Sequence, residues 1–482
     1  MSLRPSIVAL AAAALVSACA VGPDYVRPTL PVPDAYKESG DWKPAQPQAA
    51  ASGLAWWQAY GDATLAGLMN DAQAANQNIR QAEATYRQAR ALADADRAGL
   101  FPTLGLDASV SRSRTNTTGV SRVGDANSLG LAASWEPDLW GSVRRTIESG
   151  NAAAQASADD LAAARLSIQT TLAQDYVQLR IADQQRDLYD ATVAAYTKAL
   201  KLVRAQHDAG VALQSDVALA ESQLAQAQAA DVDLEATRAQ LEHAIAVLTG
   251  RAPAQFALPR AAAGQPLALQ SPASPVGLPS ALLEHRPDIA GAERRAAAAN
   301  ANIGVAKAAY FPQLTLSASG GYSAAALGSL FDTPGRVWSL GAALAQALFD
   351  GGLRSARVAQ AQAAYDVTVA QYKETVLGAF QQVEDQLSLL RLLDQELALQ
   401  DQAVRSSQQA ERLALNQYRA GTGSYLAVVT AQTLSLTNQR TAVQLRGRLL
   451  AASITLVGAT GGGWSAADPL AKAPSAAASQ PN

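Results

Sequence analysis

The chain has 482 residues, of which 49% are hydrophobic, only 5% aromatic and 16% charged, and its net charge is −3. The apolar content is mostly Ala, Leu and Val, which favours long, closely packed helices, and the near-neutral charge argues against nucleic acid as a partner. The single cysteine, Cys19, excludes an internal disulfide. Three dispersed histidines, His207, His243 and His285, do not suggest a metal site, and we expect each to be solvated or structural.

The N-terminus has the features of an export signal. A basic start is followed by an apolar run over 7–16, which is too short to span a bilayer and suits a signal-peptide core. The run Val16-Ser17-Ala18-Cys19 resembles a bacterial lipobox, which implies cleavage before Cys19 and acylation of Cys19, for instance by palmitate. Ala20 rather than Asp follows the cysteine, which by the same resemblance favours the outer membrane. An ordinary secreted protein with a chance cysteine is the alternative.

An internal repeat with a period of about 210 residues divides the rest of the chain. Phe101-Pro102 recurs as Phe311-Pro312, and the run 204–210 recurs loosely as 415–421. In the first copy we expect a helix over 65–100, a very long helix over 141–206 and a return helix over 215–249. The second copy predicts helices over 280–310, 352–418 and 425–459. Apolar residues seven apart in the two return helices indicate left-handed supercoiling, so a plain coiled-coil scaffold is an alternative.

Between the first and second helices of each copy, apolar and polar residues alternate. The apolar positions are Leu104, Leu106, Ala108 and Val110, then Leu129, Leu131, Ala133 and Trp135, and in the second copy Leu314, Leu316 and Ala318, then Trp338, Leu340, Ala342 and Leu344. A period of two predicts strands with one apolar face, of a length that suits a tilted membrane strand. Segments rich in Ser, Thr, Gly and Asn, over 114–125 and 323–335, predict exposed loops.

Four strands cannot close a barrel, and an open sheet edge in lipid leaves backbone groups unsatisfied. If these strands enter a membrane, at least two chains must share one barrel. The long helices would each extend roughly 100 Å and carry charges throughout, so they belong in an aqueous space. Cyclic assembly of the chain would then give a tube, although this reasoning does not fix the number of copies.

Several motifs, taken together and in order, resemble the TolC-like outer-membrane factors in their lipoprotein branch, which includes OprM- and NodT-like proteins. They are Cys19 to Tyr25, Trp56-Trp57, Leu282 to Ile289, Ala299 to Gly304, Leu348 to Gly352 and Tyr418 to Thr422. The resemblance covers nearly the whole chain after the signal peptide. It implies a mainly α-helical fold with a membrane β-barrel contribution, built as a homotrimer with twelve strands in one barrel and a periplasmic α-helical barrel with a coiled-coil tip.

The same resemblance implies function and partners. It indicates the passive outer-membrane duct of a tripartite efflux system for drugs and other small molecules, and hence multidrug resistance. The partners would be a periplasmic adaptor, an inner-membrane transporter of the resistance-nodulation-division type, and outer-membrane lipid. The expected segments are a signal peptide over 1–18, an acylated equatorial segment over 19–63, repeats over 64–250 and 280–460, an equatorial linker over 251–279 and a disordered tail over 461–482.

The turns at the far ends of the long helices are the candidate gate and adaptor-contact tip. Asp208 and Gly210 lie in the first turn, Arg419 and Gly421 in the second, and both glycines suit turns that require a positive φ. Some relatives have aspartates six and nine residues after the second glycine, but Ala427 and Thr430 stand there in this chain. Asp216 keeps the acidic residue in the first half, and three copies would form a cation-favouring constriction.

Each of these assignments has a simpler alternative. Asp216 could be a helix N-terminal residue favoured by the helix dipole, and Tyr418 and Arg419 could be gate contacts or a solvated helix end. A duct for type I protein secretion or for metal efflux would share the architecture, whereas a scaffold lipoprotein would not need the strands. We expect no enzyme, cofactor or metal site, because phosphate loops, HExxH patterns and nucleophile elbows are missing from the sequence.

Overall fold

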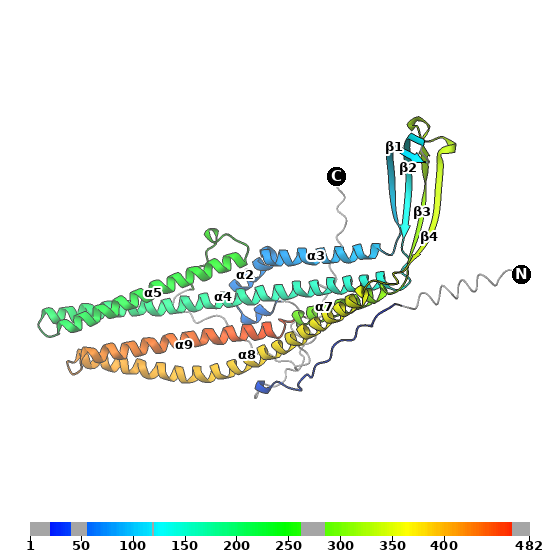
Figure 1. Ribbon diagram of the computed structural model, residues 1–482. Helices are drawn as coiled ribbons and strands as arrows, with labels where there is room; N and C mark the ends of the chain where they lie inside the picture. The colour runs from blue at the N-terminus through cyan, green and yellow to red at the C-terminus, as the bar shows by residue number, and fades with distance from the viewer. Residues whose placement is uncertain (1–19, 40–54, 118–119, 262–284, 465–482) are drawn as a thin grey trace. The chain divides into compact units, whose positions relative to one another are not determined.

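The computed structural model describes residues 20–39, 55–117, 120–261 and 285–464 (Figure 1). The predicted signal peptide, Cys19, residues 262–279 of the predicted linker and the tail beyond 464 lie outside these ranges. Within the described residues, none of the helices has the length and apolarity needed to cross a membrane. The described residues form two compact units, each assembled from both repeats: 20–30, 84–158 and 291–374 make the first, and the other described residues make the second.

The first unit contains one antiparallel sheet in the order β1-β2-β3-β4. The strands are β1 (Thr103–Thr117), β2 (Val120–Trp135), β3 (Gln313–Ala324) and β4 (Arg336–Ala345). Leu106 lies opposite Leu131, and Leu131 lies opposite Gly320. Strands β1 and β4 are the outer strands, and their apolar side chains, such as Leu106 and Leu340, are largely exposed. The predicted alternation is thus confirmed as four strands that leave an apolar face uncovered.

One of the two predicted loops is wrong. Residues 114–125 continue the first hairpin almost to its turn, with Arg112 opposite Asp125. An antiparallel ladder needs only backbone donors and acceptors, so polar side chains extend it wherever they can meet water. The second predicted loop is largely confirmed, because β3 ends at Ala324 and two short 3-10 turns precede β4.

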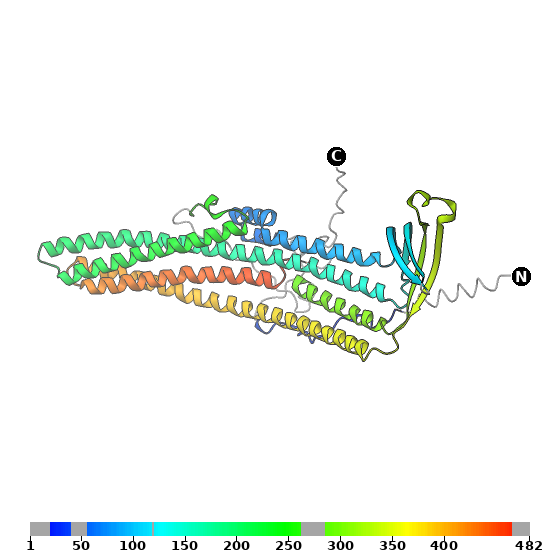
Figure 2. The same cartoon turned by 45° about the horizontal axis from the view of Figure 1, so that its top comes forward.

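A helical layer completes the first unit. It contains the C-terminal part of α3 (Gln77–Ala98), the starts of α4 (Ser142–Asp208) and α8 (Leu353–Arg419), and most of α7 (Pro287–Ala308). Side-chain contacts give the order α3-α4-α7-α8, which Figure 2 shows side by side: Arg97 donates to Asn151 (3.0 Å), Arg294 donates to Gln155 (3.4 Å), and Arg354 lies over the Tyr310 ring (5.3 Å). The helices and the strands therefore follow the same lateral order within this unit.

The segment after Ala20 is fastened to this layer. The buried Arg145 of α4 forms ion pairs with Asp24 (2.9 Å) and with Glu148 (2.7 Å), and Asn300 of α7 donates to the carbonyl of Pro23 (3.0 Å). Gly22 has φ +115°, and a Cβ there would lie 2.5 Å from the Cα of Gly304. Only glycine fits so close an approach between two backbones. A Cβ on Gly304 would in turn lie 2.8 Å from the carbonyl oxygen of Val21, which explains the glycine in the run Ala299 to Gly304.

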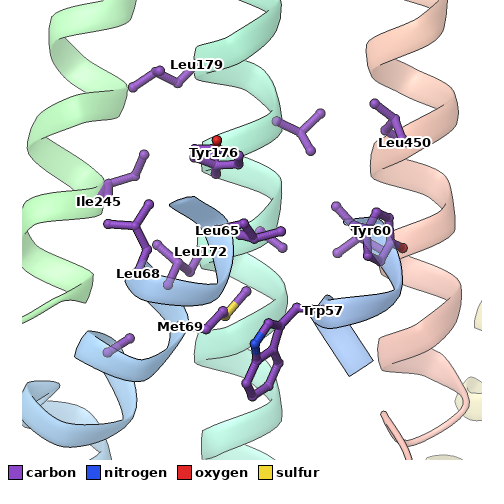
Figure 3. Packing of buried hydrophobic residues seen from close by; sticks show 14 of the residues in the cluster. Trp57, Tyr60, Leu65, Leu68, Met69, Leu172, Tyr176, Leu179, Ile245 and Leu450 are labelled. Carbon is purple, nitrogen blue, oxygen red and sulfur yellow. The ribbon is translucent and has the colours of Figure 1, made fainter. Parts of the chain in front are cut away.

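The second unit contains α2 (Ala63–Ala75), α5 (Gln214–Leu248), α9 (Tyr425–Ala459) and the C-terminal parts of α4 and α8. Helices α4 and α5 form one antiparallel hairpin, and α8 and α9 form the other (Figure 1). The largest core cluster joins Trp57 and Tyr60 to α2, α4, α5 and α9 (Figure 3). Trp57 shares this cluster with Leu172 and Tyr176 of α4, and the partly buried Trp56 packs against it. Burial of this kind contributes roughly 1.5–3 kcal/mol for each large apolar side chain.

The helix expected over 65–100 is in fact two helices, α2 and α3, separated at Asn76. The backbone of Asn76 is extended, with ψ 128°. Its side-chain oxygen accepts hydrogen bonds from the backbone N–H groups of Asn78 (2.9 Å) and Ile79 (3.1 Å), and its Nδ2 donates to the Leu248 carbonyl (2.8 Å). Asn76 therefore caps α3 and also anchors the end of α5, which a helical pattern alone does not reveal.

Candidate functional site

The two helix turns have the same backbone construction. In the first, the carbonyl of Gln206 accepts hydrogen bonds from Val211 (2.8 Å) and Ala212 (3.2 Å), and Gly210 has φ +77°. In the second, the Gln417 carbonyl accepts from Thr422 (2.9 Å) and Gly423 (3.2 Å). These bonds satisfy carbonyls that the helix end would otherwise leave unpaired. The predicted role of Gly210 and Gly421 in positive-φ turns is confirmed, since Gly421 has φ +73°.

Side chains join the two hairpins just behind these turns. The Tyr418 hydroxyl of α8 donates to Oε1 of Gln206 on α4 over 2.5 Å. The Tyr418 ring lies 5.3 Å from that of Tyr425 on α9, centroid to centroid. Tyr425 belongs to a buried cluster with Leu200 and Val203 of α4, Val217 and Ala220 of α5, and Val428 of α9. The turns therefore end a packed four-helix region in which one polar contact crosses between the hairpins.

Asp216 acts electrostatically on this region. Burial raises the pKa of the Tyr418 hydroxyl, and the negative charge of Asp216 raises it further. Burial raises the pKa of Tyr425 to about 12, with smaller contributions from Tyr418, Tyr196 and Asp216. The Asp216 carboxylate also accepts a long hydrogen bond from the backbone N–H of Leu213 (3.4 Å), at the start of α5. Asp216 thus lies at the start of α5 and also places negative charge near the turns. Within one chain, its interpretation as a helix N-terminal residue does not exclude its interpretation as part of an acidic constriction.

The other predicted site residues do not join this cluster. Asp208, Arg419, Ala427 and Thr430 are all exposed. The Thr430 hydroxyl donates to the carbonyl of Leu426 in its own helix (2.9 Å). Their roles at the tip therefore stay predictions that concern an assembly or a partner. His207 is structural, because its Nδ1 lies 3.0 Å from the Ala212 carbonyl within the first turn.

Sequence reasoning missed two members of the cluster, Gln206 and Tyr425. Gln206 immediately precedes His207, which stands where the repeat has Tyr418, 211 positions later. Tyr425 opens α9, where a large aromatic at a helix start signals packing rather than solvent. Both residues lie beside a glycine turn, and this position was the one available signal. The contact between Gln206 in the first repeat and Tyr418 in the second could not be read from the sequence.

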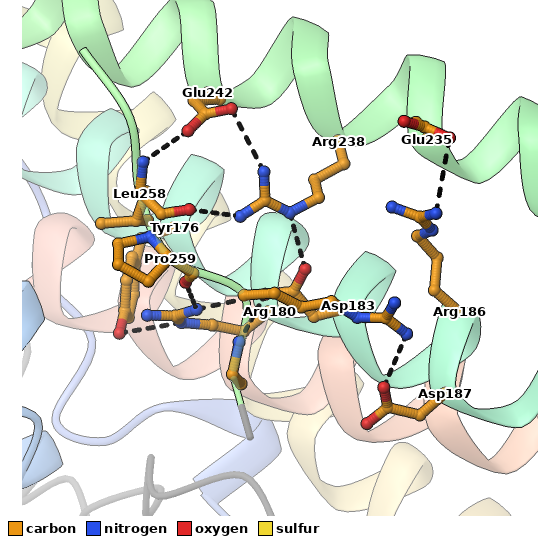
Figure 4. A network of polar contacts seen from close by, with 12 residues as sticks. Tyr176, Arg180, Asp183, Arg186, Asp187, Glu235, Arg238, Glu242, Leu258 and Pro259 are labelled. Atoms are coloured by element: carbon orange, nitrogen blue, oxygen red, sulfur yellow. Dashed lines mark hydrogen bonds and ion pairs between the residues drawn. The ribbon is translucent and has the colours of Figure 1, made fainter. Parts of the chain in front are cut away.

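A second polar cluster lies deeper along the hairpin of α4 and α5 (Figure 4). Its centre is Asp183, whose side chain is 1% exposed. One carboxylate oxygen accepts from Nε of Arg238 (2.7 Å) and the other from Arg180 (3.1 Å). Arg238 also donates to Glu242 (3.1 Å) and to the carbonyl of Leu258 (2.5 Å). Two arginines thus neutralise a carboxylate that would be costly to bury alone.

This network holds the segment that follows α5. The backbone N–H of Leu258 donates to Glu242, and Arg180 donates to the carbonyl of Pro259 (2.9 Å). Arg260 then forms ion pairs with Asp187 (2.6 Å) and Asp190 (2.8 Å). The described start of the predicted linker therefore folds back along α4. In the described part of the chain, no group of three or more His, Cys, Asp or Glu side chains is arranged to hold a metal ion.

Comparisons with known proteins agree with this architecture. The family model described as outer membrane efflux protein matches residues 68–251 and 278–462. The outer membrane protein OprJ of Pseudomonas aeruginosa is 32% identical, over 95% of this chain and 95% of its own. The toluene efflux pump outer membrane protein TtgC of Pseudomonas putida is 30% identical, over 96% of each chain.

Solved structures give the same result. The outer-membrane channel OprN superimposes with a TM-score of 0.86 at 31% identity, over 92% of this chain and 100% of its own. The open state of the Neisseria gonorrhoeae MtrE outer membrane channel superimposes with a TM-score of 0.79 at 27% identity, over 92% and 98%. Since these proteins are channels, the expectation that this chain is not an enzyme is confirmed. The chain belongs to the outer membrane efflux protein family and is an outer-membrane channel component of an efflux system.

Proposed function

We propose that three copies of this chain form one duct, in which three four-stranded sheets close a single twelve-stranded barrel. The observation that carries this proposal is the sheet itself, which has two free edges at β1 and β4 and an exposed apolar face. A free edge in lipid is unfavourable by several kcal/mol for each unpaired backbone group, so the edges favour pairing β4 of one copy with β1 of the next. The long helices then continue the tube as an α-helical barrel in the periplasm.

We infer that the duct is passive and receives small molecules, including drugs and organic solvents, from an inner-membrane pump of the resistance-nodulation-division type through a periplasmic adaptor. Relatives named as outer membrane proteins of toluene, solvent and antibiotic efflux pumps support this substrate class. Substrate choice would lie mostly in the pump, because the duct itself carries no chemistry.

We propose that the helix turns form the closed periplasmic mouth and the adaptor contact. The contact of Tyr418 with Gln206 restrains the hairpins, and Asp216 places negative charge beside it. Asp208, Gly210, Arg419 and Gly421, with Ala427 and Thr430, form the surface of the tip. An acidic ring of Asp216 residues would favour cations at the mouth.

We also propose lipid anchoring. Cleavage after residue 18 and acylation of Cys19 would place the anchor next to Ala20, whose Cα lies close to the start of α4: a Cβ on Gly141 would lie 2.9 Å from it. The segment boundaries proposed from the sequence, 19–63, 64–250, 251–279, 280–460 and 461–482, belong to the same proposal.

Accumulation of a fluorescent efflux dye tests the function directly. Host cells lacking the gene should accumulate the dye, and restoring the gene should lower accumulation. A Cys19→Ala variant serves as the control for anchoring, since it should reduce the amount of protein in the outer membrane without changing the fold. Unchanged dye accumulation together with altered protein secretion or metal tolerance would replace the proposed substrate class by one of the two rival classes.

A further inference from the structure

The two strand hairpins return to the helical layer through equivalent junctions. In the first, Asp138 accepts backbone hydrogen bonds from Val143 (3.1 Å) and Arg144 (2.9 Å) at the start of α4. In the second, Asp350 accepts from Gly352 (3.0 Å) and Arg354 (3.2 Å) at the start of α8. Each aspartate also binds the side chain of the arginine, at 3.2 Å and 2.6 Å respectively. Both junctions are therefore starts of long helices that an aspartate side chain caps.

The first junction packs on the next hairpin of its own chain. The Trp140 ring stacks on Phe311 with centroids 4.8 Å apart and planes 24° apart, and its Nε1 donates to the carbonyl of Pro312 (2.7 Å). Phe311 and Pro312 immediately precede β3, the strand beside β2. The aromatic junction residue thus seals the place where one hairpin meets its neighbour.

Among the described residues, the second junction has no such neighbour. Leu348 and Phe349 are 90% and 91% exposed, the highest values among the exposed large apolar side chains of the described residues. Phe101, the repeat counterpart of Phe311, is 68% exposed, whereas Phe311 is 39% exposed. These groups lie at opposite edges of the first unit, because β4 and α8 form one edge and β1 and α3 form the other.

We propose that Leu348 and Phe349 of one copy pack against Phe101 of the adjacent copy, repeating between chains the contact that Trp140 and Phe311 make within one. This inference rests on the proposed ring of chains. At each boundary between copies it specifies a contact of Leu348 and Phe349 with Phe101, which we call the socket. Pairing β4 with β1 of the next copy brings the two edges together at the level of the junctions. The aromatic residue is shifted by one position between repeats, since Phe349 aligns with Leu139 when Arg354 is aligned with Arg144.

Disulfide cross-linking in outer membranes tests the socket. A chain carrying both Phe101→Cys and Phe349→Cys should give, on mild oxidation, reducible species of two and three linked chains, and neither single variant should give the three-chain species. The matched control pairs Phe101→Cys with Leu340→Cys. Leu340 is also exposed and also on the β4 edge. It lies inside β4, nine residues before Phe349, and the strand from Leu340 to Ala345 alone extends about 17 Å, so this pair should not link.

Two further measurements separate the possible failures. Light scattering of the detergent-extracted protein should give about three times the mass of one processed chain, which is 49.9 kDa before removal of residues 1–18. The socket would be overturned by a three-chain mass without the 101–349 link, together with equal labelling of Phe349→Cys and Leu340→Cys by a lipid-soluble maleimide. That result would indicate that Phe349 contacts lipid, and it would leave the ring intact. A single-chain mass would overturn the ring itself. Phe349→Ala should also lower the temperature at which the assembly dissociates more than Leu340→Ala does.

Discussion

Replacing Tyr418 by Phe tests whether the contact between the hairpins keeps the mouth closed. The substitution keeps the ring packed against Tyr425 but removes the hydroxyl that donates to Gln206. A hydrogen bond of this kind contributes about 0.5–1.5 kcal/mol net, and the loss leaves a half-buried amide oxygen without its partner. If three copies open together, the sum is roughly 1.5–4.5 kcal/mol, so the open state should gain roughly 10- to 2,000-fold in population.

Single-channel recording in planar bilayers measures this population as the open probability at low voltage. Tyr60→Phe is the matched control, because it removes another tyrosine hydroxyl contact, the 2.9 Å hydrogen bond with Ser453, at the opposite end of α9. The control should lower thermal stability without raising the open probability. An unchanged open probability in Tyr418→Phe, or the same rise in both variants, would show that the Tyr418 hydroxyl does not hold the mouth closed.

Three further outcomes follow from the second unit. Asp183→Ala removes the buried carboxylate that Arg180 and Arg238 share, leaving Arg238 only its ion pair with Glu242, and should lower the free energy of unfolding by about 3–5 kcal/mol, whereas the exposed Asp190→Ala should change it by less than about 1 kcal/mol in the same thermal melts. The raised pKa of Tyr425, about 12, favours the neutral phenol in the folded state, so its stabilisation is complete below the ordinary pKa of about 10 and is lost as pH rises towards 12. Melts between pH 9 and 12 should show this loss, and a Tyr425→Phe variant with the same alkaline loss would contradict the assignment. Arg286→Ala removes a buried guanidinium that donates to the carbonyl of Ala459 (3.0 Å), so proteolysis after α9 should accelerate, and Arg286→Lys should not restore protection because it lacks the planar fork.

Regular local patterns predicted most of the elements. Period-two alternation located all four strands, and the expected helix over 425–459 matches α9 at both ends. The glycine turns were also correct, because a positive φ is a property of the local chain. The break at Asn76 was missed because its cause is not local: the side chain binds the end of α5, 172 residues away.

The candidate site was only partly predictable for the same reason. Tyr418 and Asp216 could be selected by their position beside the turns, but the partner of Tyr418 lies 212 residues earlier, in the other repeat. The polar cluster around Asp183 brings together α4, α5 and the segment after α5. In the sequence, its charged residues resemble solvated helix positions. Which of these charges are buried depends on how α4, α5 and the segment after α5 pack together, which no single hydrophobic period encodes.

The order of the strands has a consequence for how the chain folds. The hairpins of β1 with β2 and of β3 with β4 join residues that are close in sequence, so each can form early from local contacts. Pairing β2 with β3 instead joins Asn127 and Ala324 across 197 residues, and the closure of so long a segment is slow. We therefore expect the complete sheet to form late, after the intervening helices have assembled. A delayed sheet would keep the apolar strand face from forming as a continuous surface while the chain is still in water.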